Sequence, residues 1–377
     1  MIATIEVPPV SADEQATSPL RSGHSTSLGT ILEQLGSALL ITTYQAGKLV
    51  IARAGGGVVN THFRDFPAPM GLALAGGRLA IGTTADVREF HDVPAVAAKL
   101  DPPESHDACF LPRRAHVTGN ILVHELAYAA DGDLWLVNTR FSCLCTLDDR
   151  HSFVPRWRPL FISGLTPDDR CHLNGLGLRD SAPRYATALG TSDVGAGWRP
   201  AKARGGVLMD ILSGEIIANG LSMPHSPRWH DGRLWVCESG TGTVSVDDEA
   251  SGRYEAVAEL PGFTRGLEFV GRYAFVGLSQ VRETAVFSGV PITDRLPAAE
   301  RSCGVWFVDT ATGQTVALLK FEDGVQEIFA VLPTPGRRYP DLIQDDAERI
   351  NHSFVLPDAA LAAVPESLQS LIPGPRH

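Results

Sequence analysis

Three histidines occupy nearly the same place in three copies of a repeated apolar segment. The copies begin at His124 (HELAYAADGDLWLV), at His172 (HLNGLGLRDSAPRYATAL) and at His225 (HSPRWHDGRLWVCE). Neutral imidazole nitrogens are common ligands of Zn, Mn, Fe and Cu, and three of them leave coordination positions open for water or substrate. We therefore predict that His124, His172 and His225 hold one divalent transition metal.

A second interpretation of the same histidines is structural. A single histidine in an apolar strand is more often a core residue whose ring nitrogen hydrogen-bonds to a backbone carbonyl. The repetition of the placement in three copies favours a shared ligand site instead. Glu125 competes with His124 for the aligned position, because neighbouring residues of a strand face opposite sides.

Further polar residues stand at the same level of the repeats or in the segments between them. Arg140 and Arg199 are predicted to clamp an anion, for which the planar guanidinium is suited. His116 is a candidate general acid or base, and Glu327 is a candidate catalytic carboxylate. The predicted substrate-binding residues are Glu125, Asn174, Trp198, Arg265 and Gln326. Two of the carboxylates at this level could instead pair with Arg265 or with Arg228.

The repeated segment is a pair of apolar strands joined by a short turn, and it occurs five times. The second strands begin at Leu79, Leu134, Tyr185, Leu234 and Tyr273, about 40 to 55 residues apart. This spacing is typical of a repeat whose unit is one four-stranded sheet, so the sequence predicts an all-β protein with the β-propeller fold. The first strand of every blade would line the central channel, which would bring the three histidines to one axis.

The two ends of the repeat region look complementary. Residues 38–65 contain three apolar strand-like runs with no first strand before them, and residues 325–333 resemble a first strand without a hairpin partner. Pairing the ends would make a sixth blade and remove exposed sheet edges. We predict a six-bladed β-propeller over residues 28–345, with a flexible tail at 1–27 and an extension at 346–377.

Three segments between the strands are longer than a blade connection requires, namely 84–118, 191–205 and 279–304. All three follow the second strand of a blade, so we expect them to lie over the same face of the disc. Long connections in compact domains are usually lids or binding loops, and these are predicted to build one pocket over the channel. Residues 27–36 show helical spacing of leucine and isoleucine and are predicted to be a helix.

Composition limits the classes of partner. The chain has 377 residues and a formal net charge of −11, which argues against nucleic-acid binding because that needs clustered lysine and arginine. No run approaches the ~18 apolar residues of a membrane helix, and the N-terminal stretch lacks the basic start and apolar run of a secretory signal. We expect a cytoplasmic protein with a small-molecule substrate and no nucleic-acid or membrane partner. The six scattered cysteines are expected to be buried free thiols.

Several blocks of sequence resemble an uncharacterised bacterial family of conserved hypothetical proteins with a domain of unknown function. The blocks are LLITTYQAGKLV, DLWLVNTRFSCLCTLD, RCHLNGLGL, GTSDVGAGWR and SMPHSPRWHDGRLWVCESGTG, and the resemblance covers about residues 28–345. The architecture is similar, more loosely, to six-bladed lactonase and NHL-type propellers, some of which hold a catalytic metal at the mouth of the channel. The ligands of those lactonases are chiefly Glu, Asn and Asp. The matching positions here are mostly His, which resembles propeller lyases with a histidine-rich Mn site.

These observations favour a metal-dependent enzyme that acts on a small polar or carboxylated metabolite at the mouth of the channel. Lyase, isomerase, hydrolase and oxygenase chemistry all stay open at this point. The alternative is a non-catalytic propeller that binds a protein or glycan partner through aromatic residues such as Trp198, Trp157 and Phe141. The sequence does not predict the oligomeric state.

Overall fold

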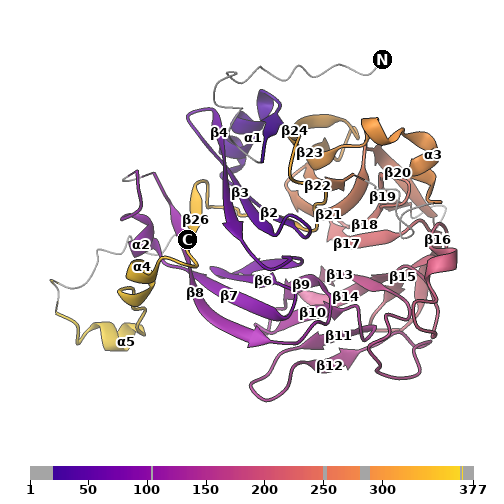
Figure 1. Cartoon of the computed structure of the whole chain (residues 1–377), viewed down its shortest axis with the longest axis horizontal. Helices are drawn as coiled ribbons and strands as arrows, with labels where there is room; N and C mark the ends of the chain where they lie inside the picture. The colour runs from indigo at the N-terminus through magenta and orange to yellow at the C-terminus, as the bar shows by residue number, and fades with distance from the viewer. Residues whose placement is uncertain (1–19, 103–104, 249–252, 281–288, 366, 368–377) are drawn as a thin grey trace.

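A ring of six β-sheets surrounds a central channel (Figure 1). The computed structural model describes residues 20–365 and 367, apart from 103–104, 249–252 and 281–288. The six-bladed β-propeller predicted from the repeat spacing is confirmed. The flexible tail expected at the N-terminus lies outside the described residues as far as residue 19.

Blades 2 to 6 are each built from four strands that are consecutive in the sequence, with the first strand innermost. Blade 2 consists of β5 (Leu72–Ala75), β6 (Arg78–Gly82), β7 (Asp86–Asp92) and β8 (Ala108–Val117), and blade 3 of β9 (Val123–Tyr128), β10 (Leu134–Asn138), β11 (Cys143–Thr146) and β12 (Val154–Trp157). Blade 4 consists of β13 (Leu173–Arg179), β14 (Ala182–Ala188), β15 (Gly206–Asp210) and β16 (Ile216–Leu221), and blade 5 of β17 (Pro224–His230), β18 (Arg233–Glu238), β19 (Thr243–Asp248) and β20 (Arg253–Glu259). Blade 6 consists of β21 (Phe263–Val270), β22 (Tyr273–Ser279), β23 (Cys303–Asp309) and β24 (Thr315–Phe321).

Blade 1 closes the ring with strands from both halves of the chain. It consists of β25 (Val331–Pro333), β2 (Leu39–Thr43), β3 (Lys48–Gly55) and β4 (Val58–Asp65). β25 pairs antiparallel with β2, so that Leu332 lies opposite Leu40. Just before β25, the Thr42 amide donates to the carbonyl of Ala330 at 3.0 Å, and the Phe329 amide donates to the carbonyl of Thr42 at 2.8 Å. The predicted pairing of the chain ends is therefore present.

Two blades carry a fifth strand at their outer edge. β1 (Ser22–His24) pairs antiparallel with β24, and β26 (Pro340–Leu342) runs parallel to β8. β1 lies within the range expected to be a flexible tail. Both added strands cover edges that would otherwise present unpaired backbone groups.

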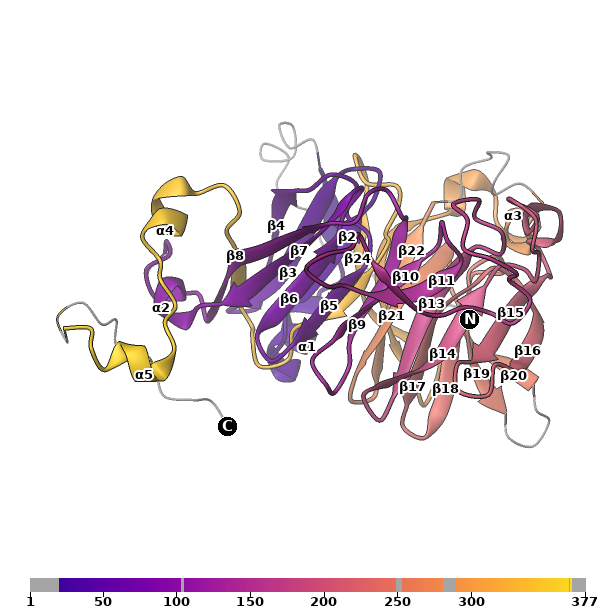
Figure 2. The ribbon, with the colours of Figure 1, turned by 90° about the horizontal axis from the view of Figure 1, so that it is seen from below.

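Short helices lie outside the ring of sheets. α1 (Ser27–Leu35) packs Leu28 and Leu32 into the core and ends at Gly36, whose φ of 58° suits glycine, so the predicted helix is present. The others are α2 (Pro94–Ala97), α3 (Pro291–Arg295), α4 (Ala347–Asn351), α5 (Asp358–Leu361) and the 3-10 turns η1 (Arg199–Ala201) and η2 (Ala298–Glu300). Figure 2 shows α2, α4 and α5 together at one side of the disc.

The prediction that residues 84–118 form a lid over the channel is wrong. This segment forms the outer half of blade 2, because β7 and β8 pair with each other and α2 fills the connection between them. Because α2 lies between the two strands, the segment is longer than an ordinary connection between strands of a blade. The other two segments do meet over one face, since Trp198 packs with Val290 and Ile292 in one apolar cluster. Residues 281–288 of the third segment lie outside the described residues.

Close packing between blades fixes the inner strands. At Gly175 on β13, an added Cβ would lie 2.1 Å from Oγ1 of Thr187 and 2.5 Å from Cδ of Pro227. A larger residue there would push blades 4 and 5 apart, so glycine holds β13 against β17. The neighbouring residue Asn174 is thereby fixed at the channel wall.

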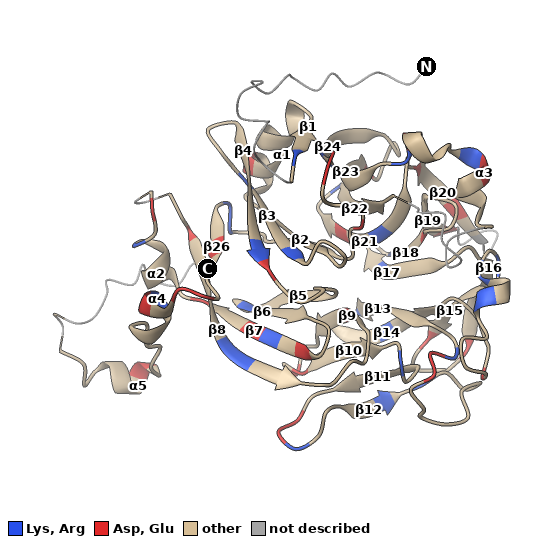
Figure 3. Ribbon diagram, in the orientation of Figure 1, with Lys and Arg blue, Asp and Glu red and all other residues tan. Residues whose placement is uncertain are grey.

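Charged residues of both signs are scattered over the blades in the view of Figure 3. All six cysteines are buried and free, as expected, and burial raises the pKa of the Cys237 thiol to about 12. Within the described residues, no helix is both long enough and apolar enough to cross a bilayer.

Candidate functional site

The three predicted histidines line one pocket at a mouth of the channel. His124 stands on β9, His225 stands on β17, and His172 immediately precedes β13, so three inner strands deliver them. The rings of His124 and His172 are 4.9 Å apart between centroids and perpendicular to each other. Trp198 lies 4.5 Å from His172 and closes the same space. We call this space, about 670 Å³ including its open side, the histidine pocket.

His124 and His225 are held by the same local device. The Nδ1 atom of His124 lies 3.1 Å from the carbonyl oxygen of Leu122, and Nδ1 of His225 lies 2.9 Å from that of Met223. A carbonyl oxygen has no hydrogen, so Nδ1 must be the donor and the lone pair must be on Nε2. Both carbonyls belong to residues with a left-handed backbone, φ 54° at Leu122 and φ 49° at Met223. Such strained residues are typical of functional sites.

His172 is anchored by a carboxylate instead of a carbonyl. Its Nδ1 atom lies 2.8 Å from Oδ2 of Asp169, which also accepts a hydrogen bond from the indole Nε1 of Trp198 at 3.2 Å. The carboxylate fixes the same ring tautomer, with the lone pair on Nε2. Sequence reasoning missed Asp169 because it precedes the strand, although its spacing three residues before His172 was a usable signal.

Burial keeps two of the imidazoles neutral. It lowers the pKa of His124 and of His225 well below the usual histidine value, and the positive charge of Arg265 lowers both further. Their Nε2 lone pairs are therefore available at neutral pH to bind a metal ion, accept a proton or accept a hydrogen bond.

Arg265 is the cation of the histidine pocket. It comes from β21 and its guanidinium stacks on the ring of Phe329 at 3.5 Å. Nη1 lies 3.4 Å from Oε1 of Glu327, a long contact for an ion pair with hydrogen bonding. Burial lowers the pKa of Arg265 to about 10, while Glu327 acts in the opposite direction. The guanidinium thus has a single, loose carboxylate contact among the described residues.

An ion triad fills the channel below the histidine pocket. Arg228 on β17 donates to Glu125 at 2.6 Å and to Glu268 at 2.8 Å, and it also reaches the carbonyl of Leu176 at 3.0 Å. The other carboxylate oxygen of Glu125 accepts from the Leu176 amide at 2.5 Å. Glu125 is therefore paired with Arg228, which is one of the alternatives considered in the sequence analysis. His124 and not Glu125 lines the histidine pocket.

Four predicted site residues lie away from the histidine pocket. His116 is on β8, at the outer edge of its blade, where Nε2 contacts the carbonyl of Ser152 at 3.0 Å. Arg199 is exposed and stacks 5.5 Å from the outer side of Trp198, and Gln326 is also exposed. Arg140 follows β10 without lining the pocket. The position of a residue in a connecting segment is therefore not enough to predict whether its side chain reaches the channel.

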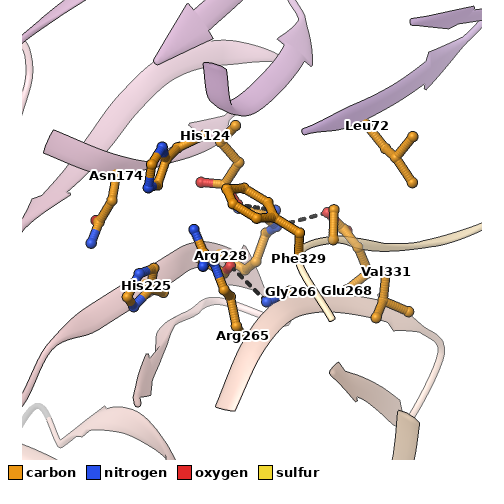
Figure 4. A pocket seen from close by; sticks show the side chains of 13 residues that line it. Leu72, His124, Asn174, His225, Arg228, Arg265, Gly266, Glu268, Phe329 and Val331 are labelled. Carbon is orange, nitrogen blue, oxygen red and sulfur yellow. Dashed lines mark hydrogen bonds and ion pairs between the residues drawn. The ribbon is translucent and has the colours of Figure 1, made fainter. Parts of the chain in front are cut away.

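The remaining predicted residues are brought together. Trp198, Arg265 and Glu327 line the histidine pocket with the three histidines. Asn174 lies deeper, between the histidines and the ion triad (Figure 4), and Glu125 belongs to the triad itself. Among the residues that the structure describes, no group of three His, Cys, Asp or Glu side chains already stands in position to hold a metal ion.

Sequence comparison identifies the family. The sequence matches the family described as Domain of unknown function (DUF4915) over residues 26–343. The chain belongs to this family. The resemblance seen in the sequence blocks is thereby confirmed. No curated protein is significantly similar to the sequence.

Solved structures with a similar fold are distant in sequence. A chain of a Nidogen/Laminin complex has 9% identity and a TM-score of 0.48, with 80% of this chain and 99% of that chain covered. A protein of unknown function from Bacteroides caccae has 10% identity and a TM-score of 0.49, with 79% and 98% covered. A catalytically inactive virginiamycin B lyase from Staphylococcus aureus with quinupristin has 11% identity and a TM-score of 0.37, with 74% of each chain covered. At these identities the comparison concerns the fold alone.

Acid should destabilise the fold through the two neutral histidines. Because the folded chain depresses the pKa of His124 and His225, the unfolded chain binds more protons below the ordinary value of 6.5. Above pH 6.5 these two groups do not lower the free energy of unfolding. As the pH falls below 6.5, each group lowers the free energy of unfolding by up to about 1.4 kcal/mol per pH unit. Urea unfolding from about pH 7.5 to about pH 5.5 should show a shallower loss for His225→Gln than for the wild type. If the free energy of unfolding falls equally steeply with pH in both proteins, His225 is not held neutral in the folded chain.

Proposed function

We propose that the chain is an enzyme that acts on a small polar or carboxylated metabolite in the histidine pocket, with a divalent transition metal as cofactor. The observation that carries the proposal is the common anchoring of three imidazoles from three blades. Each Nδ1 atom faces an oxygen acceptor, so each Nε2 lone pair is left for chemistry in one shared pocket. Three core histidines with structural roles alone would not need to share a solvent-accessible space.

Arg265 takes the anion-binding role that the sequence assigned to Arg140 and Arg199. A planar guanidinium suits a carboxylate, and its long contact with Glu327 leaves it able to bind a second anion. Apolar side chains of Met70, Leu189 and Phe263 form much of the surrounding wall. A pocket with few polar groups and apolar walls orients a small molecule and strengthens its charge contacts.

The metal would be held by the Nε2 atoms of His124, His172 and His225. Bound there, it would polarise a substrate oxygen or activate a water molecule. The donor set supports this, because metal-binding histidines usually donate the other ring nitrogen to a carbonyl or carboxylate. The described side chains do not already surround a common point, so the ion would have to draw the three rings together.

Turnover of a metabolite mixture tests the enzyme proposal. We expect liquid chromatography with mass spectrometry to show a carboxylated component consumed by the wild type, and consumed slower by about 10²-fold or more in His225→Gln. His116→Gln is the matched control, because the half-buried His116 stands on β8 at the outer edge of its blade and does not line the pocket, and it should retain the wild-type rate. Consumption at equal rates in all three proteins, or in none, would favour the alternative of a non-catalytic binding module.

A further inference from the structure

A small enclosed space lies between the histidine pocket and the ion triad. His124, Asn174, His225 and Arg265 surround it from four inner strands or their ends, as Figure 4 shows. We call this space, which has room for about one water-sized group, the inner chamber. It adjoins the histidine pocket, because His124, His225, Arg265 and Phe329 line both. A ligand in the histidine pocket would have to extend only past these shared side chains to place one small group in the inner chamber.

Asn174 presents an unused hydrogen-bond donor to this chamber. Its side-chain oxygen accepts from the hydroxyl of Thr187 at 2.7 Å, which orients the amide. Asn174 is only 3% exposed, and its buried amide nitrogen, Nδ2, has no hydrogen-bond partner. Leaving a buried donor unpaired destabilises the folded protein, so an unpaired donor at a cavity wall points to an acceptor that the ligand supplies.

Arg265 presents the second donor. Its guanidinium lies on Phe329 and has one loose carboxylate contact in the described chain, the 3.4 Å approach of Glu327. Glu327 lies toward the open side of the histidine pocket, with its side chain 23% exposed. The buried positive charge is thus only partly compensated, and a second carboxylate would compete with Glu327 for it.

The same chamber also offers acceptors. Nδ1 of His124 and of His225 donates to a backbone carbonyl, so each Nε2 carries a lone pair. A ligand that fits must therefore combine an acceptor group for Arg265 and Asn174 with a neutral donor a short distance away. An ammonium group would be repelled by Arg265, whereas a hydroxyl would not.

We propose that a 2-hydroxycarboxylate binds with one carboxylate oxygen in the inner chamber, held by Arg265 and Asn174, while its hydroxyl lies next to Nε2 of His124 and His225. In the metal-free protein the hydroxyl would donate to one of these nitrogens, and with the proposed metal held there it would be a ligand of that metal. The inference rests on the proposed function, since it places the proposed substrate in the same pocket. Two arginines line the chamber, but Arg228 is already paired with Glu125 and Glu268, so only the charge of Arg265 is left for a ligand. One available positive charge beside two carboxylates fits a monoanion better than a phosphate dianion. The rest of the molecule would extend toward Trp198.

Ligand-observed NMR titration of the purified protein tests this with four probes: lactate, propionate, lactamide and inorganic phosphate. Lactate should bind about tenfold more tightly than propionate, which lacks the hydroxyl, because one hydrogen bond is worth about 1 kcal/mol or somewhat more. Lactamide, which lacks the charge, should not bind detectably. Phosphate should bind more weakly than lactate.

Two isosteric variants of opposite charge sharpen the test. Asn174→Asp adds a negative charge at the chamber wall and should weaken lactate binding about tenfold or more. Glu327→Gln removes the competing carboxylate at a partly exposed position, and it should tighten lactate binding severalfold. A misfolded variant would only lose lactate binding, so tighter binding in Glu327→Gln together with weaker binding in Asn174→Asp shows an effect on the site and not on the fold.

Each other outcome overturns the inference. Absence of lactate binding, equal binding of propionate, tighter binding of phosphate, or lactate affinity unchanged in both variants would each contradict it. The binding assay needs no turnover, so lactate binding without conversion of any metabolite would contradict the enzyme proposal and leave this inference intact.

Discussion

Removing residues 325–377 should leave a chain that fails to form a soluble, protease-resistant propeller. The deletion takes away β25 and opens the backbone edge of β2 that it covers. It also removes Val325, Ile328 and Val331, which are at most 2% exposed in the core that joins blades 1 and 6. Burying each such side chain is worth about 1.5–3 kcal/mol, and a whole domain has a net stability of only about 5–15 kcal/mol.

A shorter deletion is the matched control. Ending the chain at Ile343 keeps β25 and β26 and removes only α4, α5 and the residues around them. We expect this variant to retain the wild-type thermal midpoint and trypsin resistance within a few degrees. If the longer deletion also folds with an unchanged midpoint, closure of the ring by β25 is not required for the fold.

Replacing Arg228 by methionine should cost about 3–5 kcal/mol of unfolding free energy. Burial alone would lower the pKa of Arg228, but Glu125 and Glu268 raise it above its usual value. Without the guanidinium, the channel would keep two carboxylates with no cation between them. The same side chain bonds to Leu176 as well, so it connects blades 3, 4 and 6 to blade 5 at the axis.

Urea unfolding at neutral pH measures this effect. Arg233→Met is the control, because Arg233 is an exposed arginine whose contact with Asp247 at 3.8 Å should contribute at most about 1 kcal/mol. Adding Glu125→Gln to Arg228→Met should recover part of the loss, since it removes one of the stranded charges. Equal losses in Arg228→Met and Arg233→Met would show that the ion triad does not hold the blades together.

The fold could be predicted because its unit is repeated. Five hairpins at similar spacing indicate a propeller even when single strand boundaries are uncertain, and complementary ends indicate closure. The prediction of a lid at 84–118 fails because α2 interrupts a strand pair, and the length of the segment alone indicates a lid. Local pattern does not distinguish a hairpin with an inserted helical turn from an irregular loop.

The candidate site was predictable only where strand alignment applies. His124, His225 and Asn174 stand on inner strands, and alignment of the repeats was enough to place them at the channel. Arg140 and Arg199 were chosen from connecting segments, whose direction depends on packing that the sequence does not show. Asp169 was missed for the same reason, because it reaches His172 through a left-handed turn with φ of 50°.

Metal content measures the central claim most directly. The protein is purified without chelator and analysed by inductively coupled plasma mass spectrometry, both as purified and after addition of Zn, Mn, Fe or Cu and removal of the excess. We expect about one divalent ion per chain in the wild type and in His116→Gln. His172→Gln should retain less than about a tenth of that amount while keeping the wild-type thermal midpoint, because its ring lines a pocket instead of the core. No stoichiometric ion in the wild type under either condition, or full retention in His172→Gln, would contradict the claim that the three anchored imidazoles form a metal centre.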